Sequence, residues 1–373
     1  MSSSASPPDF PASDRAALPA GWQDSLARLG ADRAMMASIE AAAAGHAGPA
    51  VPGRVARAEH SLITALTPAG PVRAGLTRRE QACAGDYVLL SAAEPVVAEV
   101  LPRRSQLVRH AAGNRTEPQT LAANMDEVFV TVAADRDVSL GRIERFLALV
   151  WESGTLPVVV LTKGDLLAPG AAAPLLSRAA GVAPGADVHL VSAVTGDGVG
   201  DLARRLEPGR TAALIGSSGA GKSSLLNALA GAEVAATTRV RDADGKGRHK
   251  TAWRELVVLD QGGAVIDTPG LRGLGMWLDE TGLDTAFADL TELALGCRFS
   301  DCRHATEPGC AVTAAIEAGT FEARRLESYR KLEREAAYVA RKADPGARRA
   351  QARAEHAITR EGAARARHRP RSS

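Results

Sequence analysis

The hydrophobic pattern of the chain changes near residue 124. Before that point, short apolar runs are separated by glycine, proline and polar turn residues. These runs lie at residues 53–58, 60–67, 84–91 and 95–102. Short strands with such turns are typical of a small β-barrel. In front of them, residues 1–18 have a composition typical of disorder, and the alanine-rich residues 22–46 predict a helical segment that Pro49 and Pro52 would end.

Beyond residue 124, strand patterns alternate with helix patterns. Buried strands are predicted at residues 126–134, 156–165, 188–193 and 211–219, and a hairpin at residues 255–270. Residues 139–154 have the spacing of an amphipathic helix. This alternation predicts an α/β domain with a mostly parallel sheet. After about Leu278 the pattern becomes helical.

Composition narrows the class of protein. At 373 residues the chain has room for two or three domains, and a charged fraction of 24% is ordinary for a globular protein. No apolar run reaches membrane-spanning length, and the N-terminus lacks the pattern of a secretory signal. We therefore expect no membrane association and a cytoplasmic location.

Charge is distributed unevenly, although the net charge is only +2. Residues 321–373 contain 15 lysines and arginines against 7 acidic residues, a balance of +8, so residues 1–320 carry −6. A basic tail is expected of a protein whose partner has a phosphate backbone. A solvated helix with a frayed end explains the charge equally well.

The strongest motif is G-x-x-x-x-G-K-S, which follows one apolar run and precedes another. Strand, loop and helix in this order predict a phosphate-binding P-loop rather than an accidental glycine-rich turn. Lys222 would reach the β- and γ-phosphates, and the Ser223 hydroxyl would bind Mg²⁺. The loop residues are Gly216, Ser217, Ser218, Gly219, Ala220, Gly221, Lys222, Ser223 and Ser224.

A second motif, Thr162-Lys163-Gly164-Asp165, directly follows a predicted strand. A carboxylate at Asp165 can accept hydrogen bonds from guanine N1 and the 2-amino group, and adenine offers no such pair of donors. Alone, this motif could be a helix cap, but beside a P-loop it predicts a guanine-binding site. Ser192 and Ala193, after another strand, would complete the base pocket through backbone contacts.

The sequence Asp267-Thr268-Pro269-Gly270 ends another strand. Asp267 is placed to hold Mg²⁺ through water, and the Gly270 amide to sense the γ-phosphate. A glycine-rich loop at residues 245–251 contains a threonine and suits a switch, although a plain surface loop has the same pattern. Most GTPases carry the base motif after the P-loop, whereas here it comes first, so the sequence predicts a circular permutation.

Three cysteines and one histidine crowd into 14 residues with the spacing C-x4-C-x-H-x5-C. Four nitrogen and sulfur ligands suit a closed, structural, tetrahedral Zn²⁺ site better than buried free thiols. The predicted ligands are Cys297, Cys302, His304 and Cys310. Cys83 lies apart and is expected to be a small buried residue.

Together these motifs make the chain resemble the RsgA (YjeQ) family of circularly permuted GTPases from about Gly53 to about Glu335. The resemblance includes LPRRS at 101–105, PVVVLTKGD at 157–165, GRHKTAWREL at 247–256, IDTPGLRGLGMW at 266–277 and CRFSDCRHATEPGCAV at 297–312. It implies an N-terminal OB-fold, a central permuted P-loop GTPase and a C-terminal helical zinc domain. It also implies a role in late maturation of the small ribosomal subunit. In that role the protein would bind the rRNA of the subunit and hydrolyse GTP to GDP, and the subunit would stimulate the hydrolysis.

The resemblance implies further residue roles. Leu271 stands where other GTPases carry glutamine, and the family's substitute, a switch histidine, corresponds to His249. Thr251 is the candidate Mg²⁺ ligand of the switch. The predicted domains are a lead-in (1–48), OB-fold (49–112), GTPase (113–277), zinc domain (278–342) and basic tail (343–373). The lead-in and the tail are not core features of the family, and a monomer is expected.

The residues alone leave two alternative functions open. The first is a permuted GTPase that acts on another RNA particle, such as the large subunit. The second is a passive RNA-binding module with a degenerate nucleotide site, and the site residues argue against it because they are intact: Lys222, Ser223, Asp165 and Asp267.

Overall fold

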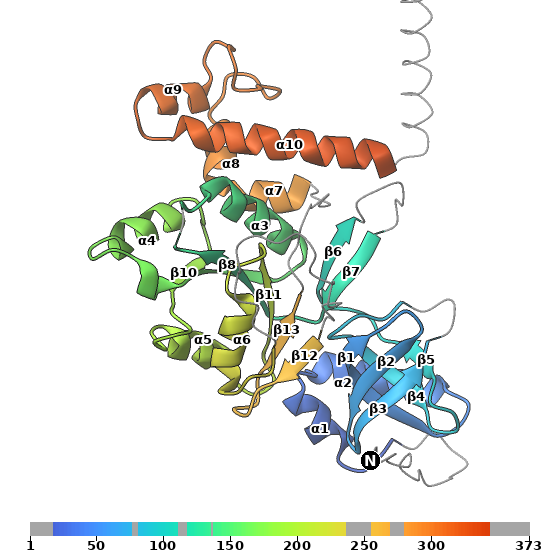
Figure 1. Cartoon of the computed structure of the whole chain (residues 1–373). Helices are drawn as coiled ribbons and strands as arrows, with labels where there is room; N and C mark the ends of the chain where they lie inside the picture. Colours follow the sequence, from blue (N-terminus) through green and yellow to red (C-terminus); the bar gives the residue numbers. More distant parts are fainter. Residues whose placement is uncertain are drawn as a thin grey trace, which may run out of the picture.

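The computed structural model describes residues 18–76, 81–110, 118–135, 137–235, 255–268 and 280–343. Figure 1 shows three parts: a small barrel, a central sheet with helices, and a helical C-terminal part. The class of secondary structure in each part agrees with the hydrophobic pattern of its residues.

Five strands form the barrel. They are β1 (Ala50–Ala58), β2 (Leu62–Thr67), β3 (Gly70–Gly75), β4 (Tyr87–Ser91) and β5 (Val97–Val100). β1 pairs with β2 and β4, β2 with β3, and β4 with β5, all antiparallel. A parallel bridge between Gly75 and Val96 closes the ring, and residues such as Val55, Ile63 and Val88 fill it. A closed five-stranded barrel agrees with the expected OB-fold; β3 is the strand that the sequence analysis did not predict.

The predicted helical segment in front of the barrel consists of two helices. α1 (Trp22–Arg28) ends before Gly30, which has φ +88°, and α2 (Arg33–Gly45) begins after Asp32, whose side chain accepts from the Met35 amide. A left-handed glycine and a capping aspartate break a helix at this point. Both helices pack on the barrel through a cluster that includes Trp22, Leu26, Ile39 and Tyr87. Pro52 does not stand between elements as expected; it lies inside β1.

The central sheet contains five parallel strands and one antiparallel strand. They are β8 (Glu127–Ala133), β9 (Leu156–Thr162), β10 (Asp187–Leu190), β11 (Thr211–Gly216), β12 (Glu255–Val258) and β13 (Ala264–Asp267). Their order is β10-β9-β8-β11-β13-β12, in which the antiparallel β12–β13 pair is the predicted hairpin. The strands that carry the base motif precede the P-loop strand in the chain yet lie in the same parallel sheet, which confirms the predicted permutation.

Helices cover both faces of this sheet (Figure 1). On one face, Val128, Val130 and Val159 pack with α3 (Leu140–Glu152) and α4 (Ala172–Ala180). On the other, Phe129 and Val158 pack with α5 (Val199–Arg205) and α6 (Lys222–Ala230). Neighbouring strand residues point to opposite faces, so strands covered on both sides must be apolar throughout. This explains the continuous apolar runs of the sequence.

The helical C-terminal part consists of α7 (Glu280–Ala286), α8 (Ala288–Ala294), α9 (Ala311–Glu317) and α10 (Ala323–Ala343). It sits on the α3 side of the sheet (Figure 1). Leu283, Ala286 and Phe287 belong to the same core as Ile143 and Leu147 of α3. Within the described ranges, no helix is at once long and apolar enough to cross a membrane.

Two links hold the barrel to the central sheet. β1 pairs with β12 at Arg57 and Glu255, so one sheet of 11 strands runs through both parts. Arg54 of β1, fully buried, donates to Thr211 Oγ1 at 2.8 Å and to the Asn124 carbonyl at 2.8 Å. Burial lowers the pKa of Arg54 and the nearby Tyr87 opposes this. These contacts fix the barrel against the start of β8 and β11.

A two-stranded hairpin of β6 (Gln106–His110) and β7 (Pro118–Ala123) follows the barrel and was not predicted. Its strands pair with each other and with no strand of the barrel that the structure describes. The expected boundary between residues 112 and 113 therefore falls between two paired strands.

Candidate functional site

The predicted P-loop lies between β11 and α6, at the carboxyl edge of the parallel strands. Gly216 ends the strand with φ +154°, and a Cβ atom there would lie 2.3 Å from Thr131 Oγ1. Only glycine fits this close approach to β8. The Thr131 hydroxyl in turn donates to the Ile215 carbonyl at 2.7 Å. The neighbouring strand β8 thus holds the turn in place. Ser218 and Gly219, in the middle of the loop, are exposed.

Lys222, the first residue of α6, reaches back over this loop. Its ammonium donates to the carbonyls of Gly216 at 2.9 Å and Ser217 at 3.2 Å, and the residue is 8% exposed. Burial lowers the pKa of Lys222, and the Asp267 carboxylate partly opposes that shift. Ser223, the next residue, is half-buried and lies at the start of the same helix. A cation placed among exposed loop amides is suited to bind phosphate oxygens.

Asp267 ends β13, beside Leu214 of the P-loop strand. Its Oδ1 atom is buried and finds no hydrogen-bond partner in the part of the chain that the structure describes. Burial raises the pKa of Asp267, and Lys222 partly lowers it. A buried carboxylate oxygen without a partner is costly unless a cation or a bound water satisfies it. The residue therefore fits a magnesium site next to the P-loop.

The base motif lies at the same sheet edge and is tied to the P-loop. Thr162, the last residue of β9, donates from Oγ1 to the Ala220 carbonyl at 2.6 Å. Lys163 follows in the left-handed region, with φ +63°, and Gly164 donates to the Val191 carbonyl at 2.9 Å. The structure thus brings the two predicted motifs into direct contact, although 58 residues separate the bonded pair.

Asp165 is oriented by Ser192. The Ser192 hydroxyl donates to Asp165 Oδ1 at 2.6 Å and accepts from the amides of Val194 at 3.2 Å and Thr195 at 3.1 Å. A hydroxyl has one proton and two lone pairs, so the two amides leave its proton for the carboxylate. Asp165 itself is exposed. Ala193, the next residue in the chain, is half-buried. The sequence predicts only a backbone contact for Ser192, and the structure adds the bond from its hydroxyl to Asp165.

Three predicted site residues, His249, Thr251 and Gly270, lie outside the described residues. One residue that the sequence analysis did not name belongs to this edge. Asp135 follows β8, and its Oδ2 lies 2.6 Å from Lys163 Nζ. Its position just beyond the end of a strand parallel to β9 was the signal that could have identified it.

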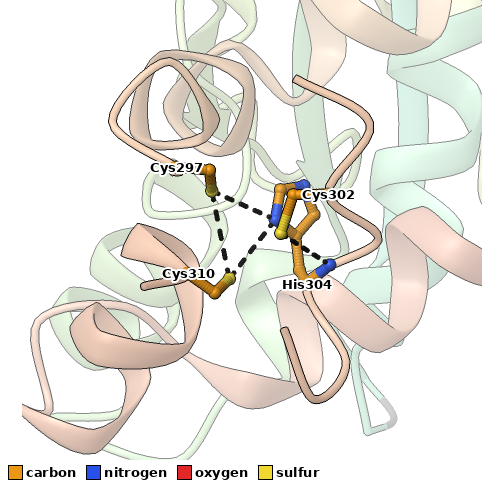
Figure 2. A group of neighbouring side chains, drawn as sticks. All are labelled: Cys297, Cys302, His304 and Cys310. Atoms are coloured by element: carbon orange, nitrogen blue, oxygen red, sulfur yellow. Dashed lines mark hydrogen bonds between the residues drawn. The ribbon is translucent and has the colours of Figure 1, made fainter. Parts of the chain in front are cut away.

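The four predicted zinc ligands converge (Figure 2). Their ligand atoms, from Cys297, Cys302, His304 and Cys310, all lie within 4.8 Å of one another. His304 Nδ1 is 3.6 Å from Cys297 Sγ and 3.5 Å from Cys310 Sγ, and the two sulfurs are 3.9 Å apart. Around a tetrahedral zinc with Zn–S bonds near 2.3 Å, ligand atoms stand about 3.8 Å apart. The cluster therefore has the size and donors of a closed zinc site.

Backbone groups support this cluster. The His304 amide donates to Cys302 Sγ, and the Thr313 amide of α9 donates to Cys310 Sγ, both at 3.4 Å. Hydrogen bonds of this kind stabilise thiolates, the form that binds metal. Glu307 accepts from the amides of the loop between His304 and Cys310, including Ala305 at 2.8 Å, and its own and neighbouring amides lower its pKa.

Proteins with similar sequences are GTPases, which agrees with the nucleotide site described above. The sequence model of the family described as RsgA GTPase matches residues 100–277. A "Small ribosomal subunit biogenesis GTPase RsgA" from Streptomyces avermitilis is 43% identical over 351 residues, which cover 92% of each chain. One of the same name from Streptomyces coelicolor is 47% identical over 310 residues, or 80% of this chain and 84% of that one.

Solved structures show the same architecture. YjeQ from Thermotoga maritima, 26% identical, has a TM-score of 0.57 and aligns over 77% of this chain and 99% of its own. YloQ, described as a circularly permuted GTPase, has a TM-score of 0.55 at 24% identity over 77% of this chain and 95% of its own. At that identity the second likeness concerns the fold alone.

Proposed function

Because the chain belongs to the RsgA GTPase family, we propose that it hydrolyses GTP to GDP and phosphate during late maturation of the small ribosomal subunit. In its GTP form it binds the particle, and hydrolysis releases it. The names of the relatives from Streptomyces support this role. So does the site, which holds phosphate-binding, base-reading and metal-binding groups along one sheet edge.

The observation that carries the proposal is the arrangement of Lys222 and Asp267 beside the P-loop, with Thr162 bonded to Ala220. The loop from Gly216 to Ser224 cradles the phosphates with its amides. Lys222 exchanges its contacts with the loop carbonyls for the β- and γ-phosphates. Mg²⁺, when bound with GTP, neutralises phosphate charge, and Ser223, Thr251 and Asp267 are the residues to hold it.

The base is selected at the end of the site that lies away from the phosphates. The Asp165 carboxylate, oriented by Ser192, accepts hydrogen bonds from guanine, and Lys163 lies along the base plane. The Ala193 backbone completes the pocket. Adenine offers no matching pair of donors, so the chain selects GTP over ATP.

Hydrolysis needs a group that orients the attacking water. Leu271 stands where many GTPases have glutamine, and we assign the role to His249 of the switch loop. Intrinsic turnover is slow, because leucine at this position cannot orient a water, and binding to the small subunit stimulates it. The Gly270 amide senses the γ-phosphate.

The Cys297, Cys302, His304 and Cys310 cluster holds one structural Zn²⁺, since all four donors are present within 4.8 Å. A closed donor set leaves no position for a reacting water. Zinc in this site ties the loop before α9 to the rest of the helical C-terminal part.

The barrel and the zinc domain contact small-subunit rRNA, and the protein acts as a cytoplasmic monomer. We place a lead-in at residues 1–48 and the zinc domain and tail at 278–342 and 343–373. The division between barrel and GTPase domain lies nearer residue 100 than 112, because β5 ends at Val100 and the family match begins at residue 100.

GTP turnover measured with and without purified small ribosomal subunits tests the proposal, with large subunits as the control. Strong stimulation by the small subunit alone is expected. Stimulation by the large subunit instead would favour the other RNA particle. Equal binding to rRNA with and without GTP, and no turnover, would favour a passive RNA-binding module.

A further inference from the structure

Asp135 and Lys163 form an ion pair at the base end of the nucleotide site. Asp135 lies just beyond β8, and Lys163 follows β9, the next strand of the sheet. Nζ and Oδ2 are 2.6 Å apart, with 29% and 17% of the two side chains exposed. Because the strands are parallel, both residues stand at the edge where Thr162 meets the P-loop.

Lys163 has two candidate carboxylate partners, Asp135 beyond the neighbouring strand and Asp165 two residues further along the chain. Asp135 holds the Lys163 ammonium, while Asp165, two residues further along the chain, has its Oδ1 occupied by the Ser192 hydroxyl. The Asp165 carboxylate is thereby left without a cation among the described residues, and it has an oxygen available for a base. A lysine side chain is long and flexible enough to reach a carboxylate two residues away.

We infer that Asp135 is a specificity-determining positioning residue: by holding Lys163, it keeps that ammonium away from Asp165 and leaves Asp165 free to read guanine. This rests on the proposed function, because it concerns the same GTP site. Without the Asp135 carboxylate, Asp165 is the nearest competing partner for Lys163 on its own loop. An ammonium on Asp165 competes with the guanine N1 and 2-amino donors for the same oxygens.

The geometry argues against a purely structural role for the pair. The Asp135 Oδ1 atom is buried and has no hydrogen-bond partner among the described residues, so these residues satisfy the carboxylate incompletely. Partly exposed ion pairs contribute little to stability. A carboxylate with an unsatisfied oxygen is a poor way to stabilise the fold.

The test uses the full chain and compares the dissociation constants of GTP and inosine triphosphate, which lacks the 2-amino group. Asp135→Asn should weaken GTP binding about tenfold, the loss of roughly one charge-assisted hydrogen bond, and should bring the two constants closer together. Asp135→Glu should restore most of the discrimination. Asp137→Asn removes an exposed carboxylate two residues away and should change neither constant.

A double mutant separates positioning from folding. If Asp135 acts by restraining Lys163, adding Asp135→Asn to Lys163→Met should cause no further loss of discrimination, since no ammonium remains to reach Asp165. Equal losses for both nucleotides in Asp135→Asn, or losses that add in the double mutant, would overturn the inference. A wild-type chain that does not prefer GTP would overturn the proposed function as well, whereas a normal wild type with an unchanged Asp135→Asn overturns this inference alone.

Discussion

The guanidinium of Arg325 on α10 lies 3.0 Å from the carboxylate of Glu144 on α3, and both side chains are almost completely buried. Arg325 also pairs with Asp289 of α8, donates to the Ala286 carbonyl at 2.9 Å and covers the Phe287 ring. One side chain thus connects α10, α8 and the end of α7 to the helix that covers the central sheet. The helical C-terminal part is docked by a buried polar contact as well as by apolar packing.

Replacing Arg325 by Met should therefore be strongly destabilising. Removing one partner of a buried pair lowers the free energy of unfolding by about 3 to 5 kcal/mol. Arg324 also binds Glu144, so the decrease will be smaller here because Glu144 keeps one cationic partner. Urea or thermal unfolding measures the change. Arg204→Met is the matched control, because its ion pair with Asp201 is largely exposed and should change stability by less than about 1 kcal/mol. Equal effects of the two variants would contradict the role given to Arg325.

Asp165→Asn should change which base is bound. An amide in place of the carboxylate loses the acceptor for two guanine donors but suits xanthine, which carries an oxygen at position 2. We expect GTP binding to weaken roughly 10- to 100-fold while xanthosine triphosphate gains relative to it. Competition binding of the two nucleotides measures the ratio, and an unchanged base preference would remove Asp165 from the base site.

Metal analysis of the purified protein should find about one zinc per chain, as one four-donor cluster requires. Replacing Cys302 and Cys310 by Ser should abolish the metal and lower the melting temperature, because zinc binding contributes to folding. Cys83→Ala, in the barrel region and away from the cluster, should retain the zinc. Zinc that survives the double replacement would place the metal elsewhere.

His249→Ala should leave nucleotide affinity unchanged and remove the stimulation of turnover by small subunits. The expected loss is large, because a residue that orients the attacking water is part of the catalytic machinery of GTPases. Comparing GTP affinity with turnover in the presence of small subunits separates the two effects. Full stimulated activity in the variant would strike His249 from the catalytic residues.

The sequence alone predicted those sites whose residues lie close together in the chain. The P-loop, the Thr162–Asp165 motif and the Cys/His cluster each occupy 14 residues or fewer. Their chemistry depends on residue type and close spacing, which local geometry preserves. The alternation of strand and helix patterns also predicted a mostly parallel sheet, and the C-terminal helices followed from their pattern.

Contacts between distant residues were decided by the tertiary structure alone. The bond of Arg54 to Thr211 spans 157 residues and that of Arg325 to Glu144 spans 181, and neither charge had a partner visible in the sequence. The Lys163–Asp135 pair spans 28 residues. Strand order brings these groups together, and order in space is set by packing of whole elements rather than by local propensity. Motif spacing therefore determined the kinds of site this protein carries, while the sheet topology decided which charges hold those sites in place.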